Sequence, residues 1–162
     1  MNIRFAEEHE LDAITSLINT AFSVERFFKK GDRLDLDITR GFFHTGRFLV
    51  AGDNGSLAAC VYVELRGDRA YLGLLSVDPA RQRSGLGRRL VSAAEEFARE
   101  MGAHFMDLRV VDVREELPGI YERYGYAASG TEPIPEEMAA QVSMPCHFVL
   151  MSKPLGNLHS SL

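Results

Sequence analysis

The sequence lacks the features that mark several classes of protein. No apolar run approaches the roughly 18 residues that a helix needs to cross a bilayer, and residues 1–11 contain no apolar signal-peptide core. Lysine and arginine number 18 against 23 aspartates and glutamates, a formal net charge of -5, which argues against a general nucleic-acid binder. We therefore expect a cytoplasmic protein with neither membrane nor nucleic acid as a partner.

Cysteine is also scarce, which bears on disulfides and metals. The two cysteines, Cys60 and Cys146, are far apart in the chain. Cys60 lies within the apolar run AACVYV, so burial as a small hydrophobic residue is favoured over a disulfide. Neither a CxxC pair nor a histidine-rich spacing is present. We therefore expect no metal site.

What is present is the composition of an ordinary globular domain. Apolar residues make up 46% and charged residues 25% of 162 residues, a length that suits one domain with a sizeable core. We find no internal repeat, low-complexity segment or interdomain linker. The sequence predicts one domain over residues 1–155, followed by a loose tail over 156–162.

The first half of the chain reads as a strand, helices and a meander. Residues 2–6 predict a short strand, and apolar residues at helical spacing predict a helix after it. The segment that follows is mixed, and we expect a helix there that is broken at Gly31 and again near Gly41. Apolar runs separated by Asn-Gly and Gly-Asp turns then predict three antiparallel strands over residues 47–77.

The second half changes period. Apolar residues from Leu86 to Met101 mark one face of a long helix, and residues 104–111 read as a strand. Pro118 opens a short helix that ends near Tyr124, and residues 146–153 form the last predicted strand. A strand, a long helix and a second strand favour a parallel crossover. The fold class is therefore α/β, a mixed sheet with helices on both faces.

The stretch RQRSGLGRRL, which joins a predicted strand to the long helix, has the properties of an anion site. Backbone N–H groups at a helix N-terminus lack helical partners, and glycines let a ligand approach them. A nucleotide P-loop is excluded because Gly87 is followed by arginines. A dinucleotide fingerprint is disfavoured because Leu90 stands where its third glycine is needed. A solvated, arginine-rich helix start is the plain alternative.

Gln82, Gly85 and Gly87 follow the order Gln-x-x-Gly-x-Gly after Val-Asp-Pro. This pattern resembles motif A of the GNAT superfamily of acyl-CoA-dependent N-acyltransferases, and PGIYERYGY resembles its motif B. The similarity extends from residue 3 to about 155. It implies a single N-acetyltransferase domain with a mostly antiparallel sheet that is flanked by helices and splayed between its fourth and fifth strands.

The resemblance also implies a site for acetyl-CoA as co-substrate. Tyr121 occupies the motif B tyrosine position and is the expected general acid toward the leaving thiolate, whereas Tyr124 is expected in the core. The residues expected to contact the cofactor are Leu75, Ser76, Val77, Gln82, Arg83, Ser84, Gly85, Leu86, Gly87, Arg88 and Tyr121. The side chains of Arg81 and Arg89 are expected to be exposed charge at the helix start.

Two positions depart from the family pattern, and both concern the chemistry. Tyr71 stands where some relatives carry a glutamate, so the general base is unassigned, with Glu64 and His44 as open choices. Arg114 stands where many relatives have an asparagine. The amine is expected near an aromatic group that could form a pocket or belong to the core, namely Phe22, Phe27, Phe28, Phe42, Phe43 and His44.

The predicted function is acetyl-CoA-dependent transfer of an acetyl group to a primary amine, on a small molecule or a protein, by direct attack in a ternary complex. A non-catalytic acyl-CoA-binding sensor or regulatory module is the alternative from another class. A nucleotide-binding domain is a third. The sequence leaves a homodimer open and does not name the amine.

Overall fold

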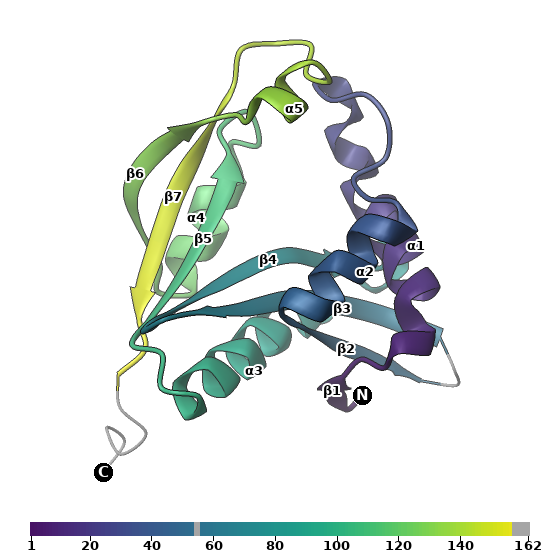
Figure 1. Ribbon diagram of the computed structural model, residues 1–162, viewed down its shortest axis with the longest axis vertical. Helices are drawn as coiled ribbons and strands as arrows, with labels where there is room; N and C mark the ends of the chain where they lie inside the picture. The colour runs from purple at the N-terminus through teal and green to yellow at the C-terminus, as the bar shows by residue number, and fades with distance from the viewer. Residues whose placement is uncertain (54–55, 157–162) are drawn as a thin grey trace.

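The chain forms one seven-stranded sheet with helices on both faces (Figure 1). The computed structural model describes residues 1–53 and 56–156. The strands, in chain order, are β1 (Ile3–Phe5), β2 (Arg47–Asp53), β3 (Ser56–Arg66), β4 (Arg69–Val77), β5 (Phe105–Val111), β6 (Ala127–Pro133) and β7 (His147–Pro154).

Within the described residues, five α-helices and three 3-10 helices accompany the strands. The α-helices are α1 (Leu11–Ala21), α2 (Leu36–Thr45), α3 (Leu86–Glu100), α4 (Leu117–Arg123) and α5 (Glu136–Ala139). The 3-10 helices are η1 (Glu8–Glu10), η2 (Phe22–Phe27) and η3 (Pro79–Arg81). No helix within the described residues is both long and apolar enough to cross a membrane.

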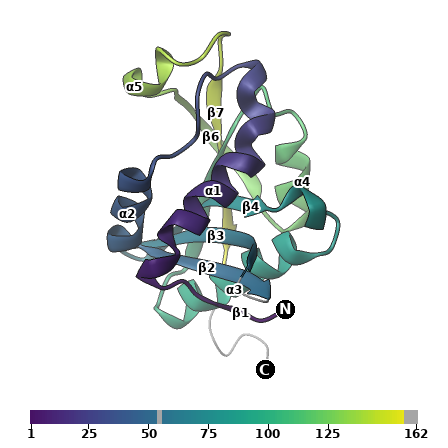
Figure 2. The same ribbon diagram turned by 90° about the vertical axis from the view of Figure 1, so that its right-hand side faces the viewer.

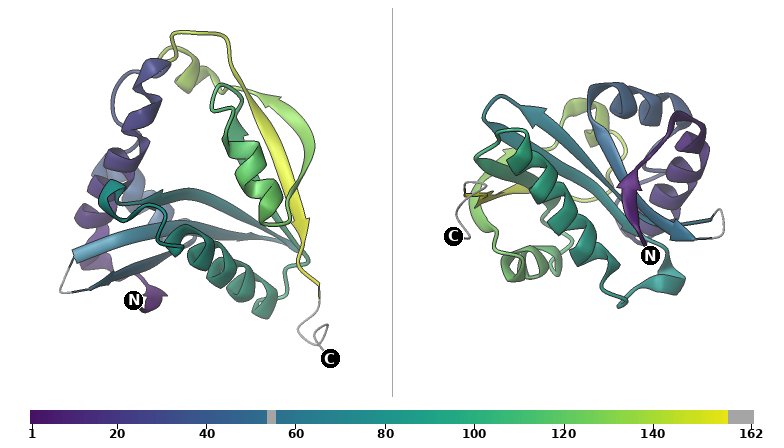
Figure 3. Two further views of the ribbon diagram at one scale, coloured as in Figure 1. Left: turned by 180° about the vertical axis from the view of Figure 1, so that it is seen from behind. Right: turned by 90° about the horizontal axis from the view of Figure 1, so that it is seen from below.

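The strand order is β1-β2-β3-β4-β5-β7-β6, and every neighbouring pair is antiparallel except β4 and β5. The parallel pair is short, because Arg69–Tyr71 pairs with Phe105–Asp107 and the strands then separate. The sheet therefore opens like a V between its fourth and fifth strands (Figures 1 and 3). This confirms the fold class and the splay predicted from the sequence.

The two faces of the sheet carry separate cores. Side chains alternate along β2, so Phe48 and Val50 pack toward α1, whereas Leu49 and Ala51 pack toward α3. Helix α1 lies across one face (Figure 2), and α3 covers the opposite face (Figure 3). Cys60 is fully buried in the α1 core, as predicted, and its burial raises the pKa of its thiol to about 12.

One predicted element needs correction, and two observed elements were not predicted. Helix α2 runs through Gly41 without a break, because the Asp35 carboxylate caps it (2.8 Å to the Ile38 N–H) and Phe42 packs on Tyr62. A single glycine costs a helix only about 1 kcal/mol, which these contacts offset. Strand β6 and the short α5 were not predicted, because β6 is mostly exposed and lacks apolar alternation.

Two further predictions fall partly or wholly outside the described residues. The Asn-Gly turn that the sequence predicts falls on residues 54–55, which lie outside the described residues. Of the tail predicted over 156–162, only Gly156 is described.

Candidate functional site

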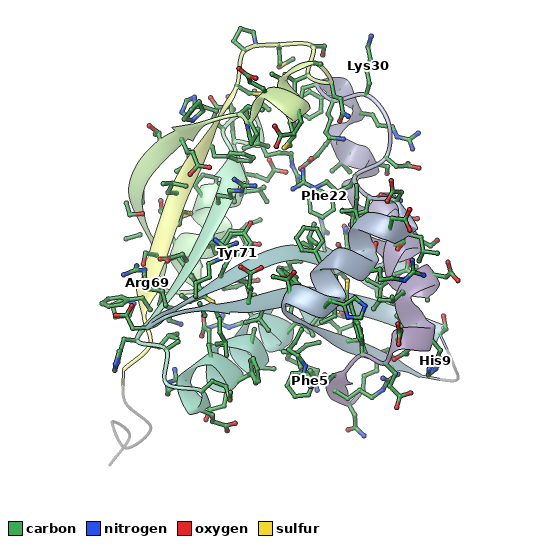
Figure 4. The ribbon with its side chains drawn as sticks, in the orientation of Figure 1. Phe5, His9, Phe22, Lys30, Arg69 and Tyr71 are labelled. Atoms are coloured by element: carbon green, nitrogen blue, oxygen red, sulfur yellow. The ribbon has the colours of Figure 1, made fainter. Side chains whose placement is uncertain are left out.

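A cleft of about 1010 Å³ occupies the opening between β4 and β5. Its walls come from the diverging ends of these strands, the loop before α3, helix α4 and the segments around η2 and α5. Phe22 and Tyr71 lie at this cleft, whereas Lys30 points away from it (Figure 4). Within the described chain no strand pairs with β4 on this side beyond Tyr71, so its backbone edge faces the cleft.

Strand β4 carries a bulge where it borders the cleft. Leu74 and Leu75 together oppose Val61, and Leu74 takes a left-handed φ of 56°. Such a conformation is uncommon for a bulky residue, and strained positions of this kind often mark functional sites. Leu75 and Val77 line the cleft, whereas the Ser76 side chain is buried and donates to the Leu74 carbonyl (3.0 Å). Ser76 therefore offers the cleft backbone groups only.

The glycine loop lines the cleft at the N-terminus of α3. Gly85 has a φ of 82°, a conformation open to glycine at little cost, and it precedes the first helical residue. The first internal hydrogen bond of α3 runs from the Arg89 N–H to the Gly85 carbonyl (3.1 Å). The N–H groups of Leu86, Gly87 and Arg88 precede this bond and form an electropositive end that suits a phosphate.

The arginines of this loop divide into two pairs. Arg83 and Arg88 line the cleft, and the Arg88 guanidinium lies 5.7 Å from the ring centre of Tyr124. Arg89 donates to the carbonyl of Met1 (2.7 Å), and the Arg81 guanidinium lies 4.0 Å from the Met1 sulfur. Only the first pair therefore has its side chains beside the candidate phosphate site.

Helix α4 brings Tyr121 to the cleft. Its ring makes edge contacts with Tyr124 (5.9 Å between ring centres) and Tyr126 (6.0 Å). Its hydroxyl forms no hydrogen bond within the described chain. Burial raises the pKa of the Tyr121 phenol above its usual range, and Tyr124 adds to this while Arg114 opposes it. The phenol therefore carries its proton at neutral pH. Tyr124 is only partly buried and lines the cleft as well as packing on the core.

A buried charged network holds the end of α4 in place. Glu95 of α3 accepts hydrogen bonds from the Tyr126 hydroxyl (2.7 Å) and the Lys153 ammonium (2.9 Å). Lys153 also donates to the carbonyl of Tyr124 (2.9 Å), the residue that ends α4. The network therefore ties α4, and with it Tyr121, to α3 and β7.

The carboxylates near the cleft are all engaged by other side chains. Glu64 accepts from the Tyr62 hydroxyl (2.6 Å) and pairs with Arg66. Asp107 makes two hydrogen bonds of 2.7 Å with Arg69. These partners hold the pKa of both carboxyls below the usual range despite partial burial. His44, the other base considered, is exposed on α2 and does not line the cleft.

The aromatic group predicted around the amine is only partly at the cleft. Phe22, Phe28 and Phe42 line it, and each also packs within a hydrophobic cluster. Phe27 is 55% exposed, and Phe43 lies outside the cleft lining. The pocket and core interpretations thus both hold for Phe22, Phe28 and Phe42, whereas Phe43 packs in the core alone.

The sequence did not predict a group of charged residues that lines the cleft away from the paired part of β4 and β5. This charged wall consists of Glu25, Lys29, Arg33 and Arg114. Glu25 is 5% exposed and binds Arg114 (3.0 Å), while Arg33 lies 4.0 Å from the same carboxylate. A backbone bridge between Lys29 and Val142 joins this wall to the segment after α5. The residues are far apart in sequence, and no local pattern identifies them as neighbours.

Comparison with known proteins finds similarity to acetyltransferases in sequence and in fold. The model of the acetyltransferase (GNAT) family matches residues 11–126. Streptothricin acetyltransferase of Streptomyces lavendulae is 32% identical over 108 residues, which cover 61% of this chain and 57% of that protein. The matched part thus spans little more than half the length of this curated relative.

Solved structures share the fold at low sequence identity. The ribosomal-protein-S18-alanine N-acetyltransferase of Escherichia coli superposes with a TM-score of 0.77 at 19% identity, covering 99% of this chain and 97% of that one. Nourseothricin acetyltransferase superposes with a TM-score of 0.73 at 23% sequence identity, covering 96% of this chain and 98% of that one. A putative acetyltransferase from Salmonella typhimurium was solved with its cofactor acetyl-CoA. It superposes with a TM-score of 0.75 at 22% sequence identity, covering 99% of this chain and 96% of that one.

Proposed function

Because this chain belongs to the GNAT acetyltransferase family, we propose that it is an acetyl-CoA-dependent N-acetyltransferase acting on a primary amine. The observation that carries this proposal is a cleft lined at one side by the N-terminus of α3 and at the other by Tyr121, whose hydroxyl forms no hydrogen bond within the described chain. The acceptor amine would reach the thioester from the end of the cleft bounded by η2 and α5.

The residues around the loop fit coenzyme A. The amides of Leu86, Gly87 and Arg88 would hold the pyrophosphate, with Arg83 and Arg88 as bidentate donors beside them. A methyl group added at Gly87 would lie 3.7 Å from Val77 and 3.9 Å from Leu75, so this glycine leaves open the space between the loop and β4. The exposed edge of β4 would pair with the pantetheine arm as an added strand does.

The bound thioester would supply the acetyl group and a thiolate leaving group. The amine nitrogen forms a bond to the carbonyl carbon, the carbon–sulfur bond then breaks, and the nitrogen loses one proton. A backbone N–H at the β4 bulge would stabilise the oxyanion. Tyr121, which is protonated at neutral pH, would donate a hydrogen bond and then its proton to the departing sulfur, and solvent would return a proton to the phenolate.

Removal of the amine proton is assigned to water rather than to a side chain. Glu64 and Asp107 are both tied to arginines, and His44 lies outside the cleft. A carboxylate whose pKa is lowered is a weak base toward an ammonium group. We therefore infer that solvent in the cleft carries the proton away.

An assay of free thiol release from acetyl-CoA over a panel of primary amines tests the proposed function. Turnover with any amine, together with the acetylated product by mass spectrometry, supports it. Binding of acetyl-CoA without turnover on any amine would favour the alternative, a non-catalytic acyl-CoA sensor. Stabilisation by ATP or NAD but not by coenzyme A would favour a nucleotide-binding domain.

A further inference from the structure

The cleft is positively charged on an acidic protein. Its lining includes seven lysines and arginines but only three aspartates and glutamates, an excess of four positive charges, while the whole chain carries a net charge of -5. Two of the seven, Arg83 and Arg88, belong to the candidate phosphate site. Five cations thus remain against three carboxylates in the rest of the cleft, where the amine would bind.

Most of the remaining charges pair with one another. Arg109 binds Glu132 (2.9 Å), and Arg66 pairs with Glu64, which lies outside the cleft lining. Arg114 takes the buried carboxylate of Glu25 (3.0 Å). The cations left in excess are Lys29 and Arg33, which lie on either side of the loop at Gly31.

The Arg33 guanidinium has five N–H donors but forms no hydrogen bond within residues 1–53 and 56–156. It lies 4.0 Å from the Glu25 carboxylate, beyond hydrogen-bonding distance, and 5.1 Å from the ring centre of Phe22. Its side chain is 25% exposed and lines the cleft. A guanidinium stacked on an aromatic ring with open donors is suited to a planar anion.

Lys29 reinforces this positive charge. It is 6% exposed, and its ammonium donates only to the backbone carbonyls of Asp32 (3.2 Å) and Lys30 (3.5 Å). Within the described chain no carboxylate lies within 4.0 Å of it. Burial lowers the pKa of the Lys29 ammonium and the nearby Arg33 charge lowers it further, while the charges of Glu25 and Asp32 oppose this in part. An anion bound at Arg33 would relieve this repulsion.

We propose that the acceptor is a small amine that also carries a carboxylate, and that Arg33, supported by Lys29, binds this carboxylate. The inference rests on the proposed function. Arg114 connects this end of the cleft to the proposed general acid. It binds the same Glu25 carboxylate, and its charge lowers the pKa of the Tyr121 phenol. A polycationic acceptor would meet Lys29 and Arg33 there, beside a Glu25 carboxylate that Arg114 already binds, so we expect it to be a poor substrate.

Matched substrates test the charge requirement directly. We would measure kcat/KM for L-phenylalanine and other L-amino acids, for their carboxamides and for the corresponding decarboxylated amines. We expect each acid to exceed its amide and its amine at least tenfold. An aminophosphonate series distinguishes a carboxylate site from a general anion site, since equal use of phosphonates would overturn the preference for carboxylate.

Arg33→Gln tests the residue. Arg114 still neutralises Glu25 in this variant, so the fold and the affinity for acetyl-CoA should be retained. We expect the preference for acid over amide to fall at least tenfold, mainly through KM. Arg26→Gln is the matched control, because Arg26 lies on the same segment, is largely exposed and pairs with Asp32 (3.1 Å) outside the cleft; it should leave the preference unchanged.

The possible outcomes separate this inference from the proposed function. Turnover of amides or decarboxylated amines that equals or exceeds turnover of the acids would overturn the inference and leave the acetyltransferase intact. An unchanged preference in Arg33→Gln would remove Arg33 from its role. Absence of turnover with every amine, with acetyl-CoA bound, would overturn both.

Discussion

At the scale of single residues, the proposed chemistry depends most on the Tyr121 hydroxyl. It lies at the cleft, its phenol stays protonated because burial raises its pKa, and no described residue accepts its proton. A thiol has an unperturbed pKa of about 8.5 and a phenol one of about 10, so the thiolate is the weaker base. The Tyr121 hydroxyl would therefore assist by donating a hydrogen bond to the sulfur as it leaves, and solvent would replace any proton that it gives up. The donor role that we propose for Tyr121 was first suggested by its place in a sequence motif, and its position at the cleft supports this proposal.

Tyr121→Phe removes the proton donor and keeps the ring contacts with Tyr124 and Tyr126. We expect kcat to fall by about 10²-fold or more, with the Kd for acetyl-CoA changed less than about threefold. Steady-state kinetics and calorimetric titration of both proteins check this. A variant with the wild-type kcat on a confirmed amine would exclude Tyr121 as the general acid.

Gly87 offers a test that separates binding from folding. A methyl group there meets only ordinary contacts in the free protein, and alanine is favoured over glycine within a helix. We therefore expect Gly87→Ala to leave the melting temperature unchanged or higher, while acetyl-CoA affinity falls at least tenfold.

The contrasting variant is Gly85→Ala. Its φ of 82° is strained for alanine, so we expect a loss of stability of about 1 kcal/mol with a smaller direct effect on the ligand. Thermal melts and titrations of both variants check the pair. Equal acetyl-CoA affinity in Gly87→Ala and wild type would show that the ligand does not approach this loop.

At the scale of elements, the separation of β4 from β5 creates the site, and one ion pair fixes where it begins. Arg69 on β4 and Asp107 on β5 bind each other through two hydrogen bonds of 2.7 Å, and Arg69 also reaches Ser152 on β7 (3.0 Å). Arg69 lies where these strands converge (Figure 4). The ion pair thus links β4 and β5 within the short segment where the two strands are paired, next to the point where they separate.

Asp107→Asn should weaken this link. Both side chains are more than a third exposed, so we expect a loss of about 1 kcal/mol or less at pH 7. Arg69 lowers the pKa of Asp107 below the unfolded value of about 3.9. Its contribution is therefore full above about pH 4 and is lost as the pH falls through the lower folded value.

Urea unfolding of wild type and Asp107→Asn at pH 7 and below pH 3 measures this difference. Asp37→Asn is the control, since Asp37 makes an exposed pair with Arg40 (3.2 Å) on α2 and should change stability by less than about 0.5 kcal/mol. A difference between wild type and Asp107→Asn that grew on acidification would contradict the assignment.

The elements also show what sequence could and could not predict. The meander and α3 follow from local apolar period and turn residues, and the loop at Gly85 follows from spacing. Strand β6 could not be predicted, because its residues are exposed and its order comes from pairing with β7. Arg33 and Lys29 were missed because their significance depends on Glu25 and Arg114, which only the folded chain brings near.

At the scale of the whole molecule, the two arms of the sheet are joined at both ends of the cleft. The apex is closed by β4 and β5, and the far end by the bridge between Lys29 and Val142, where Phe28 packs with Val111 and Phe148. A ligand that runs along the cleft would contact both arms. Binding of acetyl-CoA should therefore raise the melting temperature in a concentration-dependent manner.

The most direct test of the account is a backbone amide NMR titration with acetyl-CoA. We predict that the largest shift changes fall on Gly85, Leu86 and Gly87 at the start of α3, and on Leu75 and Val77 of β4. Absence of shifts at millimolar acetyl-CoA, or shifts gathered on another face of the protein, would contradict it.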